Sequence, residues 1–108
     1  MSNPQPELID HPAGGHFDAV IDGRVAGSAF YREVDGRVIV THTEVGDEFE
    51  GHGVGSAIAT GLLAKIRDGG QQIVPLCPFF AGYIERHAEY ADLVDEATYD
   101  RLAGRGGS

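Results

Sequence analysis

The chain has 108 residues, enough for one domain with a single hydrophobic core. Seventeen acidic residues against eight basic ones give a net charge of −9 with neutral histidines. This charge disfavours binding to nucleic-acid phosphates or to an anionic membrane surface. No apolar run reaches the roughly 20 residues of a membrane helix, and no secretory signal is visible, so we expect a cytoplasmic protein. The single cysteine, Cys77, excludes an internal disulfide and a multi-cysteine metal site.

Two Asp-Gly pairs predict an antiparallel meander in the first half of the chain. Asp22-Gly23 and Asp35-Gly36 lie between alternating apolar stretches, and Asp-Gly is a preferred pair for a two-residue hairpin turn. The three predicted strands are His16–Ile21, Arg24–Glu33 and Arg37–Val45. Alternation in the third strand places Val38, Val40, His42 and Glu44 on one face and Ile39, Thr41, Thr43 and Val45 on the other.

The apolar period becomes helical after a glycine-rich turn. A helix is predicted from Val54 to Asp68, where Gly69 and Gly70 end it. The short apolar run Gln72–Leu76 indicates a strand, which can lie parallel to the third strand through a right-handed crossover. Pro78 fits the first turn of a second helix from about Phe79 to His87, and a last short helix is predicted over Asp92–Leu102.

The predicted order β-β-β-α-β-α indicates an α/β (α+β) fold, a mixed and mostly antiparallel sheet flanked by helices. Residues 13–103 form the single predicted domain. Residues 1–12 contain three prolines and residues 104–108 are rich in glycine, so both ends are predicted to be flexible.

A glycine-rich segment between a strand and a helix is the first candidate site. Its residues are Gly51, His52, Gly53, Val54, Gly55 and Ser56, preceded by Glu50. Converging backbone N–H groups and the positive end of the helix could hold a pyrophosphate there. Alternatively, the glycines only make a tight turn. The segment lacks the Gly-Lys-Ser/Thr of a Walker loop and does not open a βαβ unit, so neither common nucleotide fingerprint applies.

Five side chains outside that segment could carry chemistry. Cys77 precedes a helix, which favours a reactive thiolate, although most lone cysteines are buried apolar residues. Tyr83 and His87 share a helix face and could exchange a proton with a substrate, or simply pack the edge of that helix. His42 and Glu44 could act as a base pair or end a solvated strand. The five histidines show no ligand spacing, so no metal site is predicted.

Three segments, taken in order, resemble the GCN5-related N-acetyltransferase superfamily, and specifically its minimal single-domain branch. Val40–Val45 is similar to the third-strand segment of that branch, and Gly51–Ala57 resembles its acetyl-coenzyme A pyrophosphate loop. Val74–Phe79 followed by Tyr83–Val94 resembles the distinctive end of the domain. The resemblance spans roughly residues 16–95.

The resemblance implies acetyl-coenzyme A as donor substrate, without a metal, and a primary amine of a small molecule or a protein lysine as acceptor. Coenzyme A would lie where the strands 37–45 and 72–76 splay apart, its pyrophosphate on Gly51–Ser56 and its pantetheine along Thr43, Glu44 and Val45. Cys77 corresponds to a cysteine near the thioester, acting as acyl acceptor or by position only. Tyr83 falls where larger relatives place a tyrosine that protonates the leaving thiolate. His42 or Glu44 would deprotonate the amine through a water molecule.

Several departures keep other functions open. Glu50 stands where the superfamily usually has Arg or Gln, and Ala88 where the branch has proline. The chain lacks the N-terminal helices that form the acceptor site of larger relatives, so a protein partner could supply that site. The alternatives are a non-catalytic coenzyme A or acyl-coenzyme A sensor, a protein-interaction module, or a nucleotide-phosphate binder. The acidic surface would favour cationic acceptors by electrostatic steering.

Overall fold

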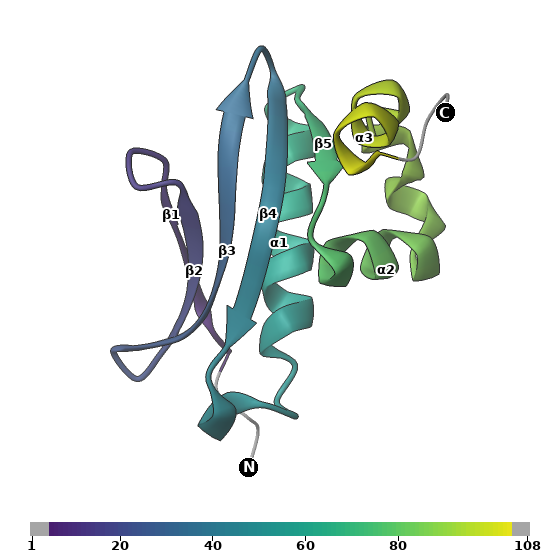
Figure 1. Ribbon diagram of the computed structural model, residues 1–108. Helices are drawn as coiled ribbons and strands as arrows, with labels where there is room; N and C mark the ends of the chain where they lie inside the picture. The colour runs from purple at the N-terminus through teal and green to yellow at the C-terminus, as the bar shows by residue number, and fades with distance from the viewer. Residues whose placement is uncertain (1–4, 105–108) are drawn as a thin grey trace.

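A computed structural model describes residues 5–104, which form a five-stranded sheet with helices packed against it (Figure 1). The strands are β1 (Glu7–His11), β2 (His16–Ile21), β3 (Arg24–Val34), β4 (Arg37–Val45) and β5 (Gln72–Pro75). The helices are α1 (Val54–Asp68), α2 (Pro78–Arg86) and α3 (Glu96–Ala103), with 3₁₀ turns η1 (Asp47–Phe49) and η2 (Ala88–Leu93). In Figure 1, α1 runs behind the sheet, and α2 and α3 lie beside β5.

The sheet confirms the predicted meander and crossover. Strands β1 to β4 are antiparallel neighbours in chain order, and β5 pairs with β4 in parallel after the chain has passed through α1. Both hairpin turns place Asp and Gly at positive φ, with values of 51° and 77° at Asp22-Gly23 and 50° and 78° at Asp35-Gly36. These are the angles for which Asp-Gly pairs are preferred in two-residue hairpins.

The N-terminal segment differs from the prediction. Residues 7–11, expected in a flexible stretch, form β1, and each of them has a partner in β2. Leu8 packs against Gly61 of α1, and Asp10 accepts a hydrogen bond from Tyr31 and pairs with Lys65 of α1. The prolines at positions 6 and 12 flank this strand and do not interrupt it. The predicted flexibility of residues 1–4 and 105–108 concerns positions outside the described residues.

The faces of β4 also differ from the prediction, because the ladder contains a bulge. Phe30 pairs with His42 but Tyr31 pairs with Val40, so Thr41 is one extra residue on β4. An extra residue moves everything beyond it to the opposite face. Val40 therefore lies in the core, whereas His42 is exposed on the other face.

The last predicted helix is divided in the structure. Residues 88–93 form the 3₁₀ turn η2, and α3 begins only at Glu96. Asp95 fixes this start, because its side chain accepts a hydrogen bond from the backbone N–H of Thr98 at 3.1 Å. The earlier elements match more closely, since β5 ends at Pro75 and α2 runs from Pro78 to Arg86, each within a residue of the prediction.

The core lies between the sheet and α1. One face of α1 is buried through Val54, Ile58, Ala59, Leu62, Leu63 and Ile66. These side chains pack against buried residues of the strands, among them Phe17, Ala29, Val38, Val40 and Ile73. Within residues 5–104, no helix is both long and apolar enough to cross a membrane.

Candidate functional site

The sheet opens between β4 and β5 because β4 continues after β5 has ended (Figure 1). Parallel pairing stops at Val40 and Pro75, and one further link follows, from the backbone N–H of Cys77 to the carbonyl of Val40 at 3.0 Å. Of the remaining residues of β4, Thr41 is the bulged residue, and His42–Val45 pair only with β3 in the described ladders. This stretch of β4 therefore faces the opening with backbone groups that β5 does not use.

The glycine-rich segment lies at the end of this opening and leads directly into α1. Gly51 and Gly53 have φ of 83° and 75°, and a Cβ at either position would meet no atom within 4 Å. These two glycines therefore supply backbone freedom and are not required by tight packing. Gly53 is the N-cap of α1, no described side chain caps this end, and its first turn contains no acidic residue. The first N–H groups of α1 are thus available to an anion.

A hollow of about 280 Å³ lies over this segment. It is lined by Val45, Phe49, Glu50, Gly51, Gly53, Val54, Gly55, Ser56 and Phe79. A Cβ on Gly55 would lie 2.9 Å from the Phe79 ring, so the close approach of α2 to α1 requires glycine there. The hollow therefore combines backbone donors with two aromatic walls. His52, which was predicted with this group, is exposed in the loop beside it.

The charges around the hollow have opposite signs. Glu50 is exposed and lines the hollow. Arg24, the first residue of β3, lies over the Phe49 ring with its guanidinium carbon 5.3 Å from the ring centroid and forms an ion pair with Glu48. The sequence does not reveal this arginine as part of the site, because Arg24 lies far from the glycine segment in the chain and only the fold brings the two together.

Cys77 lies at the point where β4 and β5 part. It is the N-cap of α2 and only 3% exposed. Its Sγ lies 3.1 Å from the Oγ1 of Thr43, which is a hydrogen-bonding distance for sulfur. The structure thus brings together two of the predicted site residues, Cys77 and Thr43, from α2 and β4.

Tyr83 joins α2 to α1. Its hydroxyl is hydrogen-bonded to the Oγ1 of Thr60 at 2.8 Å, and its ring stacks on His87 with centroids 4.0 Å apart. The predicted Tyr83–His87 face is therefore present. The centroid of the Tyr83 ring also lies 6.2 Å from the centroid of the Phe79 ring. Phe79 lines the hollow, so its ring lies between Tyr83 and the glycine segment.

His42 and Glu44 form a loose pair on the outer face of the sheet, which points away from α1 and Cys77. Their side chains are 64% and 52% exposed, with 3.8 Å between Nε2 and Oε2. The bulge at Thr41 places them on this face, while Thr43 between them turns toward Cys77. The two predicted bases are thus close to each other but on the other side of β4 from the cysteine.

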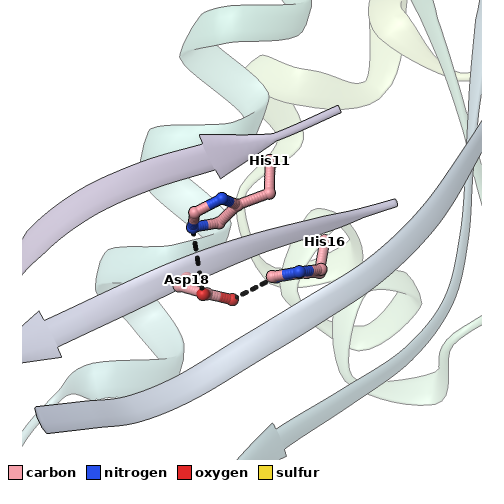
Figure 2. Close-up of side chains that lie close together, drawn as sticks. All are labelled: His11, His16 and Asp18. Carbon is pink, nitrogen blue, oxygen red and sulfur yellow. Dashed lines mark hydrogen bonds and ion pairs between the residues drawn. The ribbon is translucent and has the colours of Figure 1, made fainter. Parts of the chain in front are cut away.

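A further cluster lies on the same outer face and was not predicted. His11 of β1 and His16 and Asp18 of β2 point toward one another (Figure 2). The sequence pattern contained a signal for it, since residues flanking a hairpin become cross-strand neighbours. Because the sequence predicts a flexible segment over residues 1–12, it does not place His11 beside His16.

Comparisons with known proteins agree with this fold. A family model described as GCN5-related N-acetyl-transferase matches residues 16–93. A GCN5-like protein from Staphylococcus aureus, solved by NMR in solution, superposes with a TM-score of 0.65 at 24% sequence identity, covering 83% of this chain and 88% of its own. A search among curated proteins gave no match. With the matched segment spanning β2 through η2, the glycine segment and Cys77 included, the chain belongs to the GCN5-related N-acetyltransferase family.

Proposed function

We propose that the protein transfers an acetyl group from acetyl-coenzyme A to a primary amine. One observation carries this proposal. The start of α1 is uncapped, follows two left-handed glycines and faces a hollow beside the edge of β4 that β5 leaves unpaired. A thioester with a long pantetheine arm and a pyrophosphate matches that arrangement. The pyrophosphate would lie on the N–H groups of residues 53–56, and the arm would follow Thr43–Val45.

The charge around the hollow affects how tightly this ligand binds. Glu50 would repel phosphate groups, whereas the Arg24 guanidinium could compensate from across the Phe49 ring. Glu48 already neutralises part of that positive charge. We therefore expect modest affinity for coenzyme A, carried mainly by backbone donors.

Direct transfer is favoured over a route through an acetylated cysteine. Cys77 is 3% exposed and hydrogen-bonded to Thr43, so there is little space around its sulfur for an approaching acyl group. In direct transfer the amine nitrogen bonds to the thioester carbon, the carbon–sulfur bond breaks, and coenzyme A leaves as a thiolate. A backbone N–H at the free edge of β4 would polarise the carbonyl. The leaving thiolate takes up a proton, with the Cys77 thiol or the Tyr83 phenol as candidate donors.

The incoming amine must lose a proton. His42 and Glu44 face away from Cys77, so either of them could act only through water that reaches around the end of β4. A carboxylate-rich surface, with a net charge of −9, favours a cationic acceptor such as a lysine side chain or a polyamine.

Calorimetric titration with acetyl-coenzyme A tests the cofactor site, with ATP as the control ligand. Gly53→Ala should weaken acetyl-coenzyme A binding at least tenfold, because alanine disfavours φ of 75° by about 1–2 kcal/mol and would turn the N–H groups away. Gly36→Ala is the matched control. It introduces the same strain at φ of 78° in open space, but in the β3–β4 hairpin, and should leave binding unchanged.

The outcomes separate the candidate functions. Binding of acetyl-coenzyme A but not ATP, followed by acetylation in a screen of amines, supports the proposal. Binding without acetylation of any amine would favour the non-catalytic acyl-coenzyme A module, which Glu50 makes a serious alternative. Equal binding of ATP would point to a general phosphate site. No binding at millimolar ligand would overturn the proposal.

A further inference from the structure

Two histidines and a buried carboxylate meet at the end of the β1–β2 hairpin. His11 is the last residue of β1 and pairs directly with His16, the first residue of β2. Asp18 lies on the same face two residues further along β2. Phe17 between them packs toward Gly61 of α1, so the three side chains point away from that helix. Figure 2 shows both imidazoles directed at one carboxylate.

The distances are those of a compact donor set. The Nδ1 of His16 lies 2.8 Å from one oxygen of Asp18, and the Nε2 of His11 lies 3.4 Å from the other. One ligand atom from each residue falls within 4.8 Å of the others. Two ligands about 2.0–2.1 Å from a tetrahedral zinc ion lie about 3.4 Å apart. Shifts of about an ångström or less would therefore let all three groups share one ion.

Asp18 is held ready for this role by its surroundings. Its side chain is 8% exposed, and Ser28 of β3 donates a hydrogen bond to its Oδ1 at 2.7 Å. One oxygen of the Asp18 side chain is therefore fixed by Ser28 before any ion binds. A ligand oxygen fixed in this way by a second residue is typical of metal sites in proteins.

The cluster is open to solvent, and its ligand types suit a transition metal. The His11 and His16 side chains are 46% and 31% exposed, so an ion can approach from solvent and keep a water ligand. Two imidazoles and one carboxylate suit zinc and other divalent first-row transition ions better than magnesium or calcium, which prefer oxygen ligands alone.

We propose that His11, His16 and Asp18 bind a divalent transition-metal ion, with zinc as the representative, on the outer face of the sheet. Binding replaces the hydrogen bond between His16 and Asp18, and the His16 proton moves to, or stays on, Nε2, so that Nδ1 can coordinate the ion. The ion would tie the edge strand β1 to β2. This site uses no group of the glycine segment and does not depend on the proposed acetyl transfer.

Calorimetric titration of the untagged, chelator-treated full chain with zinc chloride tests the proposal, and magnesium chloride is the control ion. We expect one zinc per chain and no binding of magnesium. His11→Ala and His16→Ala should each reduce zinc affinity by more than roughly 10–100-fold, the loss seen when a metal site loses only a group that supports a ligand, because each variant removes a ligand itself. Asp18→Asn should do the same, but His11 is the safer variant because its half-exposed side chain contributes less to folding.

His42→Ala is the matched control variant. His42 lies on the same outer face, with its ring 6.0 Å from Phe30, but outside the cluster. Its loss should leave zinc affinity unchanged. Zinc should also raise the melting temperature of the wild type and of His42→Ala but not of His11→Ala. Overturning results would be no zinc binding at all, equal weakening by His42→Ala, or unchanged affinity in His11→Ala, each leaving the cluster as a hydrogen-bonded group only.

Discussion

Cys77 is the residue on which two mechanisms of acyl transfer differ most. If transfer is direct, Cys77→Ala should leave kcat/KM for acetyl-coenzyme A and an amine acceptor within a few-fold of the wild type. The buried thiol forms no covalent bond with the substrate on this route, and Tyr83 or water can supply the proton that the leaving thiolate takes up. Some loss of stability is expected, since a 3% exposed side chain is truncated. Steady-state kinetics with varied acetyl-coenzyme A and amine measures this.

The control for that experiment is Thr43→Val, which removes the hydrogen-bonding partner of Cys77 and keeps the sulfur. It should also retain activity. A collapse of turnover in Cys77→Ala alone, together with parallel double-reciprocal lines in the wild type, would contradict direct transfer. It would establish a covalent acetyl-cysteine.

At the scale of elements, one polar pair joins α1 to α2, in addition to the contact between Gly55 and Phe79. The hydroxyls of Tyr83 and Thr60 are 2.8 Å apart. Tyr83→Phe and Thr60→Val should each lower the free energy of unfolding by about 1 kcal/mol, and the double variant should cost less than the sum, because neither partner then remains unsatisfied. Urea denaturation of the four proteins measures the cycle.

The same pair of variants separates a structural from a chemical role of Tyr83. Both variants break the bond between the helices, but only Tyr83→Phe removes the phenol. Equal activity in the two variants is expected if Tyr83 acts by holding α2 in place. A loss confined to Tyr83→Phe, with its pH profile altered, would instead identify the phenol as the proton donor to the thiolate.

Local chemistry explains which elements could be predicted from the sequence. The Asp-Gly turns and α1 follow from backbone preferences of a few neighbouring residues, so their bounds were predicted closely. Strand β1 depends on contacts with α1 through Leu8 and Asp10, and the bulge at Thr41 depends on its ladder with β3. Neither can be seen in a short window. For the same reason, the glycine segment was predicted from sequence, whereas Arg24 and the His11–His16–Asp18 cluster were not.

For the whole molecule, acid stability depends on how the C-terminal helix is tied to the sheet. Arg37, the first residue of β4, donates to the carboxylate of Asp95, which is also the N-cap of α3. Thr98 donates to the same carboxylate through its hydroxyl at 2.7 Å. The hydrogen bonds from Arg37 and Thr98, with a smaller contribution from the charge of Arg37, lower the pKa of Asp95 from 3.8 to about 2. Asp95 therefore joins β4, β5 and α3, since its backbone N–H also donates to the carbonyl of Ile73.

This lowered pKa fixes the direction of a pH effect. A carboxyl group that is more acidic in the folded chain than in the unfolded one stabilises the fold fully above its unfolded pKa, here 3.8. That contribution is lost as the pH falls from about 4 toward 2. Asp95→Asn should therefore be less stable than the wild type at pH 7, and the gap should shrink through this window. Denaturant unfolding at a series of pH values measures it, with Asp22→Asn, an equal charge change in an exposed turn, as the control. A gap between wild type and Asp95→Asn that stays constant down to pH 2 would show that Asp95 holds α3 through hydrogen bonds alone, without any contribution from its charge.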